Sequence, residues 1–127
     1  MKIHVKVDRC EFDRAVEAVG DDPYDYRTLC RNCPVAMAVK TALAGTRFDG
    51  YVPSVTGGEV VVYEGGSLTA AEVAAASLPE EAHRVIVGFD KLKLGNTYAY
   101  GGAAAKCDPQ FVEAEFDLEL VEPGDPL

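Results

Sequence analysis

The sequence predicts an α+β fold. Two observations lead to this prediction: apolar residues alternate with polar ones near both ends of the chain, and they recur at helical spacing in between. Ile3, Val5 and Val7 alternate with polar residues, which indicates a half-buried strand over 2–8. The same alternation returns over 110–122, so a second strand of this kind is expected near the C-terminus.

Length and composition limit the organisation of the chain. With 127 residues, of which 48% are hydrophobic, the chain is long enough to bury one core without disulfide or metal staples. We find no internal repeat. A single domain over 1–122 is therefore expected, followed by a short tail over 123–127 that is rich in Pro and Gly.

Two helices are expected after the first strand. Over 9–19 the apolar residues fall at helical spacing, and Asp8 precedes Glu11 by the three residues of a capping box. A second helix is predicted to begin at Pro34 and to end near Gly45. This second segment is rich in Ala, Val, Met and Leu, so the helix should be buried on most faces.

A hairpin and a helical region complete the middle of the chain. The hairpin is predicted over 50–63, with a turn at Gly57-Gly58 and with Pro53 marking its first strand as an edge or a bulge. The region 67–94 carries two helix-start signals. They are Thr69 three residues before Glu72, and Ser77 three residues before Glu80, and the second predicts a helix that ends at Gly95.

The two terminal strands carry complementary charges on their polar faces. The first presents Lys2, His4 and Lys6, and the last presents Glu113, Glu115, Asp117 and Glu119. Opposite charges across a strand pair are stabilising, whereas four like charges on one face repel. We therefore expect the first and last strands to be adjacent and antiparallel, with His4 as a cross-strand or solvated group.

The expected element order is β-α-α-β-β-α-β. This order is that of the ferredoxin-like split βαβ unit, in which the first and last strands are also antiparallel neighbours. The charge pattern and the element order thus predict the same arrangement of the chain ends.

The charge balance excludes several classes of partner. The formal net charge is −9 and the isoelectric point is about 4.6. Such a chain is not expected to bind nucleic acid directly or to dock on an anionic membrane. No segment approaches the length of about 20 apolar residues that spans a membrane, and the N-terminus lacks a signal-type apolar run. We expect a cytoplasmic protein that has a basic partner or is simply kept soluble by its charge.

Four cysteines supply the sharpest local chemistry. Cys33 is predicted at the N-cap of the buried helix, where the helix dipole favours a thiolate, and Cys30 lies three residues before it. The pair has the spacing of a redox site or of half a zinc site. Cys10 and Cys107 are expected at the same end of the sheet and could complete a four-cysteine zinc site; the alternative is four reduced, packed thiols.

The predicted loops contain tyrosines, which suit recognition surfaces. Tyr24, Tyr26, Tyr98 and Tyr100 stand among Gly, Asp and Asn residues. Tyrosine gives a large contact area at a low cost in conformational entropy, although such residues could equally cover the open face of a sheet. We find no Ser/His/Asp grouping and no phosphate-binding glycine motif, so a catalytic centre is not expected.

Part of the sequence resembles a family of small uncharacterised proteins from actinobacterial phages. The residues that carry the resemblance are Cys33-Pro34-Val35-Ala36-Met37-Ala38, Phe89-Asp90 and Phe116-Asp117-Leu118. The regions around 46–66 and 95–108 are longer than in the short members of that family. The resemblance brings no activity, but it implies a phage origin and action in the cytoplasm of a bacterial host.

The sequence thus favours a phage accessory protein that acts by stoichiometric binding. Its target would be a host or anti-phage defence protein or a small signalling ligand, held by the loop tyrosines and the acidic strand face. One alternative is a zinc- or thiol-dependent module built on Cys30 and Cys33, and another is an acidic mimic of DNA. No other cofactor is indicated, and the sequence is compatible with a homo-oligomer.

Overall fold

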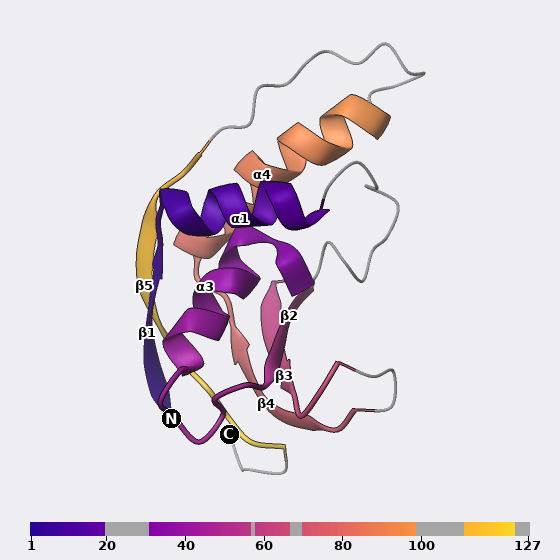
Figure 1. The fold of residues 1–127 in the computed structure, drawn as a ribbon. Helices are drawn as coiled ribbons and strands as arrows, with labels where there is room; N and C mark the ends of the chain where they lie inside the picture. The colour runs from indigo at the N-terminus through magenta and orange to yellow at the C-terminus, as the bar shows by residue number, and fades with distance from the viewer. Residues whose placement is uncertain (20–30, 57, 67–69, 99–110, 124–127) are drawn as a thin grey trace.

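The structure is a computed structural model of the chain that describes residues 1–19, 31–56, 58–66, 70–98 and 111–123. The described residues form three helices and five strands in an α+β arrangement, as predicted (Figure 1). In chain order the elements are β1 (Lys2–Val7), α1 (Arg9–Val19), α3 (Pro34–Leu43), β2 (Val52–Thr56), β3 (Glu59–Tyr63), β4 (Glu72–Ser77), α4 (Glu80–Tyr98) and β5 (Ala114–Glu119). None of the described helices has the length and apolar character needed to cross a membrane.

The described strands form two antiparallel sheets. One consists of β1 and β5, and the other has the order β2-β3-β4. The sheets are joined just beyond the end of β5, where the backbones of Ala75 and Val121 exchange hydrogen bonds of 2.8 and 2.9 Å. This isolated bridge places Val121, just after β5, beside β4.

The pairing of the terminal strands is confirmed. Lys2 lies opposite Glu119, His4 opposite Asp117 and Lys6 opposite Glu115. The chain end adds to the ladder, since the N-terminal ammonium donates to the Leu120 carbonyl at 2.8 Å. Both strands alternate between buried and exposed residues, so their charged faces point outward together.

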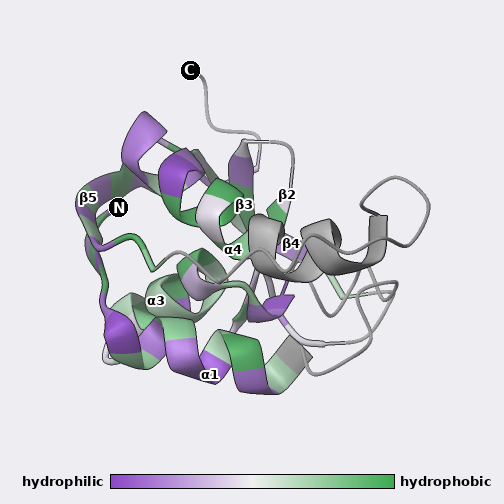
Figure 2. Ribbon diagram, turned by 90° about the horizontal axis from the view of Figure 1, so that it is seen from above, coloured by the Kyte–Doolittle hydropathy of each residue, from purple (hydrophilic) through white to green (hydrophobic). Residues whose placement is uncertain are grey.

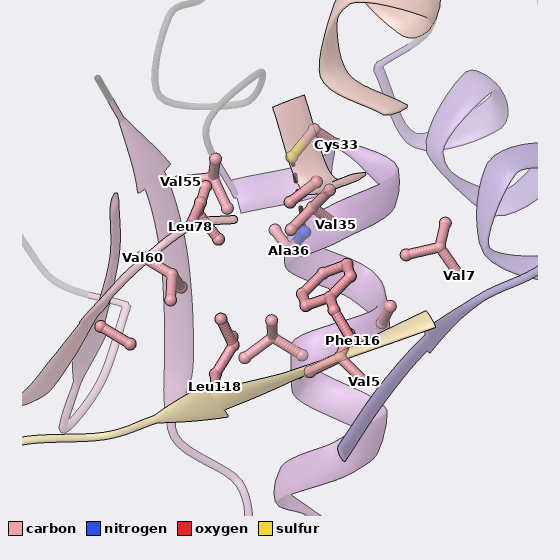
Figure 3. Packing of buried hydrophobic residues seen from close by; sticks show 14 of the residues in the cluster. Val5, Val7, Cys33, Val35, Ala36, Val55, Val60, Leu78, Phe116 and Leu118 are labelled. Carbon is pink, nitrogen blue, oxygen red and sulfur yellow. Dashed lines mark hydrogen bonds between the residues drawn. The ribbon is translucent and has the colours of Figure 1, made fainter. Parts of the chain in front are cut away.

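Helix α3 lies between the two sheets and forms the centre of the core. It packs against β1 on one side and β2 on the other, and side chains from both sheets converge on it (Figure 3). Val35, Ala36 and Val39 on this helix are fully buried, as its apolar composition predicts. The helix begins as expected, because Cys33 is its N-cap and its Sγ accepts a hydrogen bond from the Ala36 N–H at 3.4 Å.

Helix α1 packs against α3 and begins with the predicted capping box. The Asp8 carboxylate accepts from the N–H groups of Cys10 and Glu11, and the Glu11 carboxylate accepts from the Asp8 N–H at 3.1 Å. The helix carries apolar and polar residues along its length (Figure 2). Its Phe12 packs edge to face on Phe89 of α4, with ring centroids 6.2 Å apart, which links the two helices.

The hairpin of β2 and β3 matches the prediction closely. Thr56 pairs with Glu59, which is the register that the predicted two-residue connection requires. Gly58 has a φ of 95°, a conformation that favours glycine. Pro53 lies in β2, an edge strand of the three-stranded sheet, where its missing N–H is tolerated.

The helix predicted between the hairpin and α4 is not present. The spacing of Thr69 and Glu72 indicated a helix, but Glu72–Ser77 forms β4 and pairs with β3. The run of alanines has high intrinsic helix propensity, yet Ala74 and Ala76 are buried while Glu72 and Ser77 are exposed, as on a strand. Pairing with β3 therefore overrides the local preference.

The boundary predicted for the last helix is also corrected. Helix α4 does not end at Gly95 but continues to Tyr98. A single glycine lowers helix stability by about 1 kcal/mol relative to alanine, which does not by itself end a helix.

Candidate acidic interface

The outer face of β5 is acidic and solvent-exposed. Glu115, Asp117 and Glu119 point outward from the strand, and Glu113 is exposed just before it. The alternate residues Ala114, Phe116 and Leu118 are buried against the core, so the period of two in the sequence fixes this face. All four acidic residues of the predicted binding set are thus described and lie along one line.

The neighbouring strand β1 neutralises part of this acidic line. The two ring nitrogens of His4 lie 2.6 Å from Glu115 Oε1 and 2.8 Å from Asp117 Oδ1, and Lys2 Nζ lies 3.7 Å from Asp117 Oδ2. The hydrogen bond with Asp117, followed by that with Glu115, raises the pKa of His4. The hydrogen bond with His4 is the main cause that lowers the pKa of Asp117. The face is therefore a ladder of paired charges rather than an uninterrupted anionic surface.

A groove opens where the two sheets meet at the Ala75–Val121 bridge. It has a volume of about 530 Å³ and is bounded by β4, the start of β3, the end of β5 and the chain after β5. The residues that line it are Glu59, Glu72, Ala75, Ala76, Ser77, Glu119, Val121, Glu122 and Pro123. Four of these nine residues are glutamates, and none carries a positive charge.

The four glutamates of the groove differ in their partners. Glu122 forms an ion pair with Arg47, and Glu119 lies 3.7 Å from the N-terminal ammonium. Within the described part of the chain, no cation is paired with Glu59 or Glu72, and both of these residues are exposed. The groove thus offers two carboxylates for which an external cation could be the partner.

The described lining of the groove combines carboxylates with small side chains. Ser77 carries a hydroxyl group, and none of the described lining residues carries an imidazole or a thiol. Its lining includes Ala75, which is partly exposed, and Ala76, which is largely buried in the core. Carboxylates beside a small apolar residue suit a ligand with positive charge and an apolar stem.

Of the residues that line this groove, only one was predicted from the sequence as a binding residue. It identified Glu119 through the acidic strand, but it did not identify Glu59, Glu72 or Glu122. These residues come together only because β4 is a strand that meets the chain after β5, and the region of β4 was predicted to be a helix. The one local signal for Glu59 was its place directly after the predicted glycine turn.

The predicted cysteine site is described only in part. Cys10 is exposed near the start of α1, and Cys33 is buried with 5% exposure at the start of α3. Cys30 and Cys107 lie outside the described residues. Within the described part of the chain, no group of three or more His, Cys, Asp or Glu residues is arranged to hold a metal ion. The four-cysteine zinc site therefore stays a prediction.

Most of the predicted tyrosine surface also lies outside the described residues. Tyr24, Tyr26 and Tyr100 are outside the described residues. Tyr98 is the last residue of α4 rather than a loop residue, and the description does not include its side chain. The acidic face and the groove are therefore the candidate site that the structure defines.

Taken together, the fold and the site define an α+β protein with an acidic groove at the junction of two antiparallel sheets. Comparisons with protein-family models, with curated proteins and with solved structures find no match to this chain.

Proposed function

We propose that this protein acts by stoichiometric binding, as a phage accessory protein that captures a basic protein segment in the cytoplasm of a bacterial host. The segment would present lysine or arginine to the acidic groove, and the outer face of β5 would extend the contact. The target would be a host or anti-phage defence protein. The observation that carries the proposal is the groove of about 530 Å³ with four glutamates, two of which have no cation partner within the described residues.

Electrostatics support a protein partner of this kind. The formal net charge of −9 attracts basic surfaces over a distance and speeds their encounter with the groove. Glu59 lies opposite Ser77 and Glu72 opposite Tyr63, at the two ends of β4, so each can pair with a different basic side chain of the segment while an apolar stem covers Ala75. Recognition then comes from both charge and shape.

The alternative of a DNA mimic receives less support from the same surface. A mimic of the DNA backbone would present regularly spaced negative charges without interruption. On the outer face of β1 and β5, however, Lys2, His4 and Lys6 lie directly opposite the acidic residues. We therefore favour a basic protein segment over a DNA-binding protein in general as the target.

The proposal is tested with a defined basic peptide. Binding of a fluorescein-labelled lysine- and arginine-rich peptide is measured by anisotropy for the wild-type protein and for the double variant Glu59→Gln/Glu72→Gln. The loss of two ion pairs should weaken binding by about three- to tenfold, and added salt should weaken binding of the wild type more than that of the variant.

The matched control is the double variant Glu17→Gln/Glu81→Gln, which changes the net charge equally. Glu17 on α1 and Glu81 on α4 are exposed and do not line the groove. The control should bind like the wild type. Equal weakening by both double variants would show that only net charge matters and would contradict the proposed site. A pull-down from host lysate, with the same two variants, then identifies the natural target.

A further inference from the structure

The side chain of His4 joins the two terminal strands through both of its ring nitrogens. Nε2 lies 2.6 Å from Glu115 Oε1, and Nδ1 lies 2.8 Å from Asp117 Oδ1. His4 belongs to β1 and its two partners belong to β5, more than 110 positions away in the sequence. The ring is thus held between two carboxylates of the neighbouring strand.

Two short contacts of this kind, with a carboxylate at each ring nitrogen, suit a protonated imidazole. A neutral imidazole has one N–H and one bare nitrogen, and a bare nitrogen cannot donate to a carboxylate. With both carboxylates ionised, only the imidazolium ion donates from both nitrogens. Asp117 remains ionised because its pKa is lowered, first by the hydrogen bond from His4. The contacts therefore exist in full only while His4 carries its second proton.

We infer that His4 is a pH-sensitive clamp that fastens β1 to β5 and so holds the two ends of the chain together. Protonated His4 makes two charge-assisted hydrogen bonds across the strand pair, and loss of its proton leaves one of the two carboxylates without a donor. The inference goes beyond the proposed binding function and stands whether or not the groove captures a partner.

The surroundings of the clamp are charged groups on the same outer face. On β1 these are Lys2 and Lys6, and on β5 and next to it these are Glu113, Glu115, Asp117 and Glu119. The N-terminal ammonium lies at the end of the ladder, beside Glu119. Helices α3 and α4 pack against these strands from the opposite, apolar face, so among the described residues they add no charge next to His4.

The direction of the pH effect follows from proton linkage. A group with a raised pKa in the folded chain stabilises the fold fully below its ordinary pKa and loses this contribution as the pH rises through the raised pKa. For His4 the loss begins near the ordinary value of 6.5 and continues to the raised pKa. For Asp117 the contribution is present above 3.8 and is lost as the pH falls through the lowered pKa. The clamp therefore stabilises the fold most between about pH 3.8 and pH 6.5.

The first test is an NMR titration of the imidazole signals, which is simple because the chain has two histidines. The His4 signal should titrate at a higher pH in the folded protein than in the urea-unfolded chain. In the double variant Glu115→Gln/Asp117→Asn, its midpoint should fall back toward the unfolded value. If His4 titrates at the same pH in the folded and unfolded chains, the clamp does not exist.

The second test measures the midpoint of urea unfolding between about pH 5.5 and pH 8. Wild type should exceed His4→Gln at the acidic end, and the difference should shrink as the pH rises through the His4 titration. His4→Lys, which keeps a positive charge throughout this range, should retain its advantage over His4→Gln at every pH. His83→Gln should keep the wild-type profile.

The comparison between variants removes the effect of groups that all of them share, including the N-terminal ammonium. A His4→Gln protein with the same pH profile as the wild type would overturn the inference. If His4→Gln fails to fold, His4→Lys and the wild-type NMR titration still decide it.

Discussion

Two features of the structure favour glycine at position 58, between β2 and β3. Its φ of 95° is strained for any residue with a Cβ. In addition, a Cβ at this position would lie 3.3 Å from Cε1 of His83 on α4. The Gly58 carbonyl accepts a hydrogen bond of 2.8 Å from the Leu78 N–H, which fixes the turn against the chain between β4 and α4.

We expect Gly58→Ala to destabilise the fold more than Gly45→Ala. Gly45 also has a positive φ, of 79°, but open space surrounds the position of its absent Cβ. Its substitution should therefore cost only the backbone strain, about 1–2 kcal/mol. Gly58→Ala should cost this strain and the contact with His83. Urea unfolding of both variants measures the difference, and His83→Ala in the Gly58→Ala background should reduce it. Equal losses at the two glycines would show that the histidine contact is unimportant.

Some residue-scale features were predictable from sequence because they depend on local pattern. The cross-strand role of His4, the capping box of Asp8 and Glu11, and the capping position of Cys33 were all expected and are present. Whether Cys33 is exposed was not predictable, because burial at a helix start depends on what packs over it. Its 5% exposure follows from the placement of α3 between two sheets.

At the scale of single elements, the hydrophobic period and the strand pairing decided which strands could be predicted from the sequence. Strands β1 and β5 were predictable because strict alternation of polar and apolar residues fits only a half-buried strand. Strand β4 was not, because its alanines have high helix propensity and carry little hydrophobic contrast between the two faces. Its identity depends on the ladder that it forms with β3, which is a non-local interaction.

The start of helix α3 can be tested through the reactivity of its capping cysteine. Cys33 is buried, whereas Cys10 is exposed. In the native protein, iodoacetamide should label Cys10 within minutes, but it should label Cys33 only when α3 opens. Peptide mapping by mass spectrometry assigns each thiol, so labelling of other cysteines does not interfere. The Cys33/Cys10 rate ratio should be below about 0.01, and should approach one in urea. Equal native rates would contradict the burial of Cys33.

At the scale of the whole molecule, the two sheets pack around α3, and among the described residues one backbone bridge joins them. The adjacency of the terminal strands was predictable from complementary charge, since the four like charges on the acidic strand repel unless a basic neighbour such as the first strand offsets them. The acidic groove was not predictable, because its walls come from β3, β4 and the chain after β5, and no local pattern relates these segments. A groove of this kind becomes visible only when the sheets are placed in space.

Removal of residues 121–127 would test the contribution of the bridge between Ala75 and Val121. This deletion takes away two backbone hydrogen bonds, of 2.8 and 2.9 Å, and the exposed ion pair between Arg47 and Glu122. Each hydrogen bond contributes about 0.5–1.5 kcal/mol and a surface ion pair at most about 1 kcal/mol, so a loss of about 1–4 kcal/mol is expected. Urea unfolding measures this loss.

Two further variants separate the bridge from the simple shortening of the chain. Deletion of residues 124–127 alone keeps the bridge and should leave the stability close to that of the full chain. Val121→Pro keeps the length but removes the N–H that donates to the Ala75 carbonyl, so it should reproduce a good part of the loss. The longer deletion also removes Val121, Glu122 and Pro123 from the groove, and binding of the basic peptide should weaken with it. If both deletions unfold at the same urea concentration, the bridge does not hold the sheets together, and the packing of each sheet on α3 must do so alone.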